Sequence, residues 1–215
     1  MKVRIERLWE QAKCWAAGGR SRDTASDRSD TPDAAAVLNT LGWTIGADDV
    51  GDRVASVGLG DRRVRLIYGY RSFPDHCVFE ASLSTSTDAF SKACRAIRED
   101  CEQYTPLLVA DRAIVVRVAH RDDRHVGQAA EDAISWARGK DLDGALSRLI
   151  QMPTTSPGAR PIWHLAALAV SGHAATLESY LSAFEAGDRL GFMPYITKGH
   201  VERALRHAVR PVDVL

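Results

Sequence analysis

Three strand-like runs separated by very short connections constrain the fold of this chain more than any other sequence feature. The runs cover residues 53–59, 63–70 and 76–83. Only a few residues separate each run from the next, which permits hairpins but not the long crossovers that parallel strands need. The runs therefore predict an antiparallel meander. A later run at residues 107–119, rich in β-branched residues, is expected to complete the sheet as a fourth strand.

Helical patterns surround and follow these runs. One covers residues 33–41, and another begins after Thr87, whose side chain can cap a helix. Beyond the fourth run every pattern is helical, with segments at residues 126–138, 143–151, 162–171, 174–186 and 197–209. We expect two N-cap residues and three left-handed glycines that end helices: Asp143 and Thr197, and Gly139, Gly172 and Gly187.

The fold class predicted by this order is α+β. An antiparallel sheet of about four strands with flanking helices is expected at residues 33–138, and a C-terminal helical region packed on it at residues 139–215. Residues 1–18 form an amphipathic pattern that includes Trp9 and Trp15, which predicts an N-terminal helix. Residues 19–32 are rich in Ser, Asp and Arg, which is typical of a flexible linker.

Charge and composition exclude several classes of protein. The 28 basic residues balance the 28 acidic ones, so no overall positive field favours nucleic acid as a partner. The first residues are charged where a signal peptide would be apolar, and no apolar run is long enough to span a membrane. We therefore expect a cytoplasmic protein. Its four cysteines form no CxxC pair and are expected to be free thiols.

The predicted sheet carries the first candidate site. Because side chains alternate between the two faces of a strand, Arg63 and Arg65 lie on one side of their strand. With aligned registers, Glu80 and Arg117 join them on the same surface. One interpretation is a solvated face with cross-strand ion pairs. The other is an arginine-lined platform that binds an acidic partner.

A second candidate lies where the fourth strand run ends. Two imidazoles and two carboxylates that could ligate a divalent metal occur together there: His120, Asp122, Asp123 and His125. Their spacing fits neither an HExxH motif nor a zinc finger, and two arginines are interleaved with them. The interpretation that we favour is a polar connection between a strand and a helix, in which the aspartates support the turn and the start of the next helix. We nominate no metal site, cofactor or catalytic set.

The third candidate is the segment at residues 187–196, which places Phe192 and Tyr195 between two helices. An apolar connection of this kind usually fills a crevice of its own domain. If exposed, it would supply the aromatic anchors that protein interfaces favour.

The order of elements from residue 33 to about residue 138 resembles the small secretion-chaperone-like fold of bacteria. The resemblance concerns topology and carries no residue signature, and the helical C-terminal region departs from it. Bacterial immunity proteins share the same profile of compact, cytosolic proteins without motifs. Both resemblances imply a protein that binds another protein, either a toxin or a secreted effector.

The first hypothesis is therefore a cytosolic bacterial protein-binding protein, with an immunity protein that neutralises a cognate toxin placed first. It predicts that Arg65→Glu or Arg117→Glu weakens the complex. One alternative is a secretion chaperone or adaptor. Another is a metal-dependent or hydrolytic enzyme that uses the cluster between His120 and His125. A third is a regulatory module whose helical half dimerises, or contacts nucleic acid through Arg203, Arg206, His207 and Arg210 on its last helix.

Overall fold

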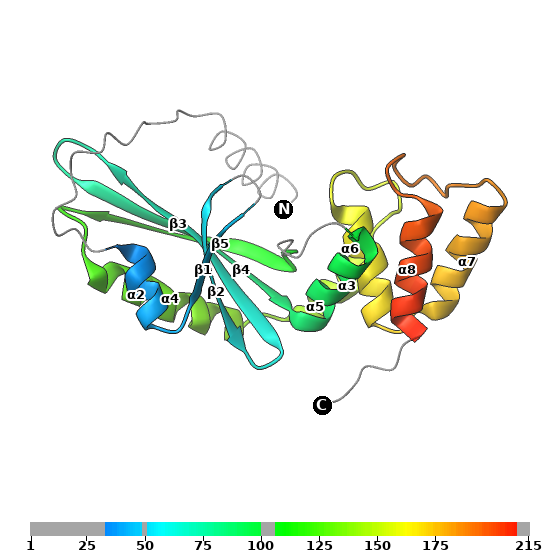
Figure 1. Cartoon of the computed structure of the whole chain (residues 1–215), viewed down its shortest axis with the longest axis horizontal. Helices are drawn as coiled ribbons and strands as arrows, with labels where there is room; N and C mark the ends of the chain where they lie inside the picture. Colours follow the sequence, from blue (N-terminus) through cyan, green and yellow to red (C-terminus); the bar gives the residue numbers. More distant parts are fainter. Residues whose placement is uncertain (1–32, 49–50, 100–105, 210–215) are drawn as a thin grey trace. The chain divides into compact units, whose positions relative to one another are not determined.

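The computed structural model describes residues 33–48, 51–99 and 106–209, so the helix and the linker expected at residues 1–18 and 19–32 lie outside the described residues. The fold is α+β, with an antiparallel sheet, flanking helices and C-terminal helices (Figure 1). In chain order the elements are α2 (Ala34–Thr40), β1 (Thr44–Ala47), β2 (Arg53–Leu59), β3 (Arg62–Ser72), β4 (Cys77–Thr87), α3 (Asp88–Arg98), β5 (Val109–Val118), α4 (Asp123–Arg138), α5 (Leu142–Ile150), α6 (Arg160–Val170), α7 (Ala174–Glu185) and α8 (Lys198–Val209).

The sheet has five strands in the order β1-β2-β3-β4-β5, and each strand pairs antiparallel with the next one along the chain. Four of the strands are those that the alternating runs predict. The fifth, β1, is a four-residue strand that the sequence pattern did not reveal. It pairs with β2 at one edge, and the ten-residue β5 forms the other edge of the described sheet.

One face of the sheet is covered by helices α2 and α4 (Figure 1). The register places Leu66 opposite Leu83, and Phe79 opposite Val116. These side chains meet a row of small residues on α4 and the ring of Trp43 in one hydrophobic core. The alanines of α4 are small, which allows the helix to pack closely on the sheet.

A second hydrophobic core lies among helices α3, α5, α6, α7 and α8. Its fully buried residues include Phe90 and Ile97 of α3 and Leu165 and Leu168 of α6. The helical region is therefore not made of residues beyond 139 alone. Helix α3, which precedes β5 in the chain, packs with the C-terminal helices rather than with the sheet core.

The ends of the helices differ in part from the prediction. Asp141, not Asp143, caps α5, because the Asp141 carboxylate accepts a hydrogen bond from the backbone N–H of Gly144 at 2.8 Å. Gly172 and Gly187 have the expected left-handed backbone, with φ of 73° and 84°. Gly139 ends α4 with φ of −81°, so this position does not require a glycine conformation.

Polar contacts join the sheet to the turn between α4 and α5. Arg62, at the start of β3, donates hydrogen bonds to the carbonyl oxygens of Ala137 and Lys140 at 2.8 and 2.9 Å. Asp111 of β5 accepts from the indole N–H of Trp136 and from the ammonium of Lys140. The bonds from Arg62 occupy carbonyl groups near the end of α4, where a helix leaves such groups without partners. Among the described helices, none is both long enough and apolar enough to cross a lipid bilayer.

Candidate binding face

The second face of the sheet is covered by none of the described helices, and we call it the uncovered face. Because successive side chains of a strand point to opposite faces, every side chain between two core positions points to this face. Its members on β2 to β5 are Val54, Ser56, Arg63, Arg65, Ile67, Arg71, Val78, Glu80, Ser82, Ala113, Val115 and Arg117. The first candidate set of the sequence, Arg63, Arg65, Glu80 and Arg117, therefore lies on one surface.

The arginines of this face are held in ion pairs. Arg65 lies 3.4 Å from Asp48, and only 12% and 13% of these two side chains are exposed. Arg63 pairs with Asp88 at 3.2 Å and Arg117 with Asp75 at 3.4 Å.

Glu80, which the sequence placed near Arg65 and Arg117, instead pairs with Arg71. The face therefore carries cations that are neutralised locally, and its net field toward an acidic ligand is weak.

The uncovered face also carries aliphatic side chains. Val54 and Ile67 lie directly opposite each other on β2 and β3, whereas Val78 on β4 lies between Arg71 and Arg117. Val115 on β5 is 64% exposed. None of these four side chains belongs to either hydrophobic core of the described residues.

An aromatic and cationic cluster lies at the end of the β3–β4 hairpin. The Phe73 ring, 45% exposed, stacks on the imidazole of His76 with 4.5 Å between ring centroids. His76 donates to the carboxylate of Asp75, and this hydrogen bond lowers the pKa of Asp75. Arg121 lies over the ring of Tyr70 at 5.3 Å. Sequence reasoning missed Phe73, although an aromatic residue beside a proline in a hairpin connection was a visible signal.

The residues between His120 and His125 do not form a metal site in the structure. Asp122 caps α4 by accepting from the backbone N–H of Arg124 at 2.8 Å, and its carboxylate also pairs with the Arg124 side chain. These bonds lower the pKa of Asp122 to about 2. Within residues 33–48, 51–99 and 106–209, no three His, Cys, Asp or Glu residues are grouped as a metal would need.

The segment at residues 187–196 is fixed to its own domain. Phe192 is buried and contacts the rings of Tyr180, Phe184 and His164, which makes it a core residue rather than a partner contact. Tyr195 is 46% exposed, and its hydroxyl donates to the carbonyl oxygen of Gly158. Of the two aromatic residues proposed from sequence, only Tyr195 reaches the surface.

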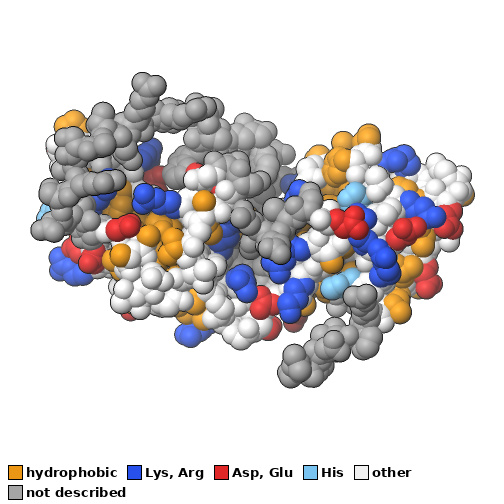
Figure 2. Space-filling model, viewed as in Figure 1, with side chains coloured by type: hydrophobic (Ala, Val, Ile, Leu, Met, Phe, Trp, Pro, Cys, Tyr) orange, Lys and Arg blue, Asp and Glu red, His pale blue; other side chains and the backbone are white. Residues whose placement is uncertain are grey.

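At least one basic residue of α8 also binds other groups of this chain. Arg203 donates to the carbonyl oxygen of Ile97 at 2.7 Å and pairs with Glu99 at 3.1 Å, so it joins α8 to the end of α3. Arg210 lies outside the described residues. On the side of the molecule shown in Figure 2, acidic and basic side chains are interspersed over the C-terminal helices. This arrangement does not resemble the single-sign surface that nucleic-acid binding requires.

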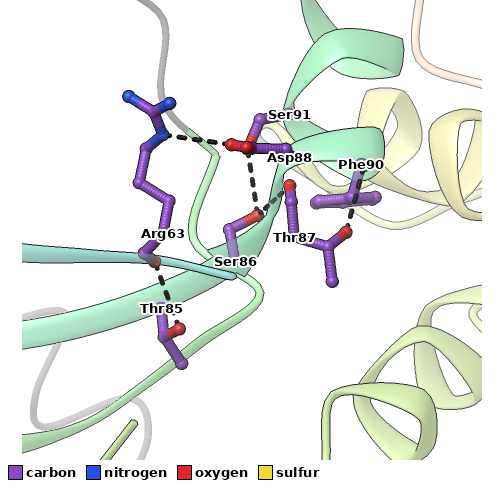
Figure 3. A network of polar contacts seen from close by, with 7 residues as sticks. All are labelled: Arg63, Thr85, Ser86, Thr87, Asp88, Phe90 and Ser91. Carbon is purple, nitrogen blue, oxygen red and sulfur yellow. Dashed lines mark hydrogen bonds and ion pairs between the residues drawn. The ribbon is translucent and has the colours of Figure 1, made fainter. Parts of the chain in front are cut away.

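A network of hydroxyl groups connects the uncovered face to the helical region, where β4 passes directly into α3 (Figure 3). Thr85 donates to the carbonyl oxygen of Arg63, and the hydroxyls of Ser86 and Ser91 lie 3.1 Å apart. All three hydroxyl-bearing residues are buried. Because buried hydroxyls need hydrogen-bond partners, this pairing lets a polar segment of β4 lie inside the molecule.

A family model described as a family of unknown function, DUF6990, matches residues 30–209 of the chain. No curated protein and no solved structure matches it.

Proposed function

The chain belongs to the DUF6990 family, whose function is unknown, and from its own residues we propose that it is a protein-binding protein that holds one partner on the uncovered face. One observation carries the proposal. The two faces of the sheet differ: α2 and α4 cover one, whereas the other presents aliphatic side chains that neither core uses.

A face that only meets water has a different composition. In antiparallel sheets with one solvated side, polar residues alternate with core residues along each strand. Here Val54, Ile67, Val78 and Val115 take positions that a solvated face would give to polar side chains. Aliphatic side chains interspersed with ion-paired ones are compatible with a protein interface, which combines apolar and polar groups.

The partner class that we place first is a cognate toxin, which the protein would neutralise as an immunity protein. A secreted effector, escorted by a chaperone or adaptor, is the second. Both rest on the same surface, where the paired arginines at the rim would select the partner more than they would tighten the complex. The aromatic cluster at Phe73 extends this surface beyond the ends of β3 and β4.

The test is a binding measurement with the product of the neighbouring gene, purified and titrated by calorimetry. Arg117 and Val115 are the best positions to change, since 68% of the Arg117 side chain is exposed and Val115 is 64% exposed. We expect Arg117→Glu and Val115→Arg to weaken binding about tenfold or more each. The matched control is Arg148→Glu on the exposed side of α5, which should bind normally.

Circular dichroism of every variant must match that of the unmodified protein. Equal affinity of the two face variants and the control would remove the uncovered face as the binding surface. Absence of any measurable binding would remove the neighbouring product as the partner.

A further inference from the structure

Strand β5 is a long edge strand whose outer side has no strand neighbour among the described residues. It spans ten residues without glycine or proline, and within the described sheet it pairs only with β4. Arg112 and Ala113 point to opposite faces of the sheet, and both are exposed. An edge of this kind presents a row of backbone N–H and C=O groups that can pair with another strand.

The other edge of the described sheet is much less suited to pairing. Strand β1 has four residues, one of which is Gly46, and a very short edge strand limits pairing with other chains. At the β5 edge, helix α4 packs on β3 and β4 and reaches β5 through Trp136 and Lys140, which both bind Asp111. Residues 112–118 therefore form the longer edge to which a second strand can be added.

The charges of β5 suit a second copy of the same strand. We consider two copies that pair antiparallel about a twofold axis at Ile114. Arg117 of each copy then lies level with Asp111 of the other, and Val115 lies level with Ala113. The Asp111 side chain is 56% exposed and that of Arg117 is 68% exposed. Opposite charges at level positions of paired strands are favourable, and the twofold axis forms this contact twice.

Other registers of the same pairing fit less well. An axis at Arg112 or at Arg117 places that arginine opposite its own copy, which is unfavourable. An axis at Ala113 or at Val115 avoids this, but it places Arg117 opposite an uncharged residue. The axis at Ile114 is therefore the register that the charges favour.

The partners that Arg117 and Asp111 already have do not prevent this contact. Arg117 pairs with Asp75 at 3.4 Å, and 68% and 72% of these two side chains are exposed, so the pair contributes little. Asp111 accepts from Trp136 and Lys140, and an ionised carboxylate can accept further hydrogen bonds. Both side chains can therefore bind a second copy without losing their present contacts.

We propose that two copies of this chain pair through β5, antiparallel about a twofold axis at Ile114, so that two five-stranded sheets become one continuous sheet. The axis is perpendicular to the sheet, so it turns the two uncovered faces to the same side. The dimer extends the uncovered face across both copies and leaves it open to a partner. No other protein takes part in the dimer, so its failure and the failure of the proposed function are separate outcomes.

Exchange of charges in the full chain tests the dimer. Arg117→Glu places two carboxylates at each of the two contacts, and Asp111→Lys places two cations there. An equal mixture of the two variants restores opposite charges at both contacts of a mixed dimer. The matched control is Arg148→Glu, on the exposed side of α5. Light scattering after size exclusion gives the mass over a wide range of concentration, and circular dichroism checks the fold.

A disulfide experiment gives a second measurement that does not depend on Asp111. Ala113→Cys and Val115→Cys are carried by differently tagged copies, because residues 113 and 115 lie level across the proposed axis. After mild oxidation of the mixture, peptides that link the two tagged copies are identified by mass spectrometry. Each variant oxidised alone is the control, since its introduced thiols are then offset along the strands.

We expect the unmodified chain and Arg148→Glu to reach twice the mass of one chain. Each charge variant alone should have a dissociation constant raised about tenfold or more, and the mixture should recover the dimer. A monomer at every concentration overturns the proposal, as does a dimer that neither charge variant weakens. A mixture that stays monomeric also overturns it. If Asp111→Lys fails to fold, the disulfide decides: a link between residues 113 and 115 only in the mixture supports the dimer, and no link overturns it.

Discussion

The side-chain oxygen of Thr87 accepts a hydrogen bond from the backbone N–H of Phe90 at 3.1 Å, at the point where β4 becomes α3 (Figure 3). No loop separates the strand from the helix. Strand β4 contributes Phe79 and Leu83 to the sheet core, whereas Phe90 is fully buried in the helical core. This one cap therefore fixes the first turn of a helix that ties two hydrophobic cores together.

Replacing this cap should lower the stability of the whole described unit. We expect Thr87→Ala to reduce the free energy of unfolding by about 1 kcal/mol, the usual value of an N-cap. Thr87→Ser retains a hydroxyl acceptor, so its free energy of unfolding should fall by much less. Urea denaturation followed by circular dichroism measures both. Equal stability of the alanine and serine variants would show that the bond does not contribute.

The strands were the most predictable part of the fold. Period-two alternation with short connections predicted β2, β3, β4 and β5 close to their observed bounds. The edge strand β1 was not predicted, because its four residues include Gly46, which carries no side chain to show alternation. The packing of α3 with the C-terminal helices also could not be read from the sequence. Its apolar stripe fits either core, and only the direct exit from β4 decides between them.

The sequence predicted which residues of the candidate site share one face of the sheet, but not the ion pairs that they form. Alternation alone places Arg65, Glu80 and Arg117 on one surface. It cannot give the register, so it did not reveal that Glu80 pairs with Arg71. Nor could it show that the Phe192 ring is buried, since burial of a connecting segment depends on helices that are distant in sequence.

His164 should make stability depend on pH. It is buried, one ring nitrogen lies 2.9 Å from the carbonyl oxygen of Leu149, and the other lies 3.1 Å from the Tyr180 hydroxyl. Burial lowers the pKa of His164 below its ordinary value. Below about pH 6.5 the unfolded chain therefore binds a proton that the folded chain does not. We expect the free energy of unfolding to fall as pH decreases from about 6.5 toward the lowered pKa.

His164→Gln should flatten that part of the pH dependence, because the variant carries no titrating group at this buried position. Thermal unfolding between pH 5 and pH 8 makes the comparison. An unchanged slope in the His164→Gln variant would assign the pH dependence to other groups.

The two described cysteines should differ in reactivity. Cys94 is fully buried in α3, and burial raises the pKa of its thiol, whereas Cys77 at the start of β4 is only partly buried. Because the thiolate is the reactive form, iodoacetamide should alkylate Cys77 roughly tenfold faster or more in the folded protein. Peptide mass spectrometry over time measures both rates. In denaturant the difference should vanish; if it persists there, burial is not its cause.

Phe192 and Tyr195 should respond differently to truncation. Phe192→Ala removes a buried ring among Tyr180, Phe184 and His164 and should cost about 3–5 kcal/mol. Tyr195→Ala, at a position 46% exposed, should cost about 1 kcal/mol. Chemical denaturation of both variants gives the values. If Phe192→Ala lowers the free energy of unfolding only slightly but weakens partner binding, Phe192 is a contact residue of the interface.

Two neighbouring residues of β5 test whether only one face of the sheet is packed by the rest of the molecule. Ile114 lies opposite Ala81 and packs against the sheet core, whereas Val115, opposite Glu80, points to the other face and is 64% exposed. Threonine suits a strand at either position, so a change to it tests burial more than strand propensity. Ile114→Thr removes apolar contacts and places a hydroxyl against the core, and should cost about 1–2 kcal/mol. Val115→Thr should stay within about 0.5 kcal/mol of the native value, because no core contact is lost. Urea denaturation of the two variants measures the difference. Equal costs would mean that both sides of β5 are packed, and a partner would then have no free surface there.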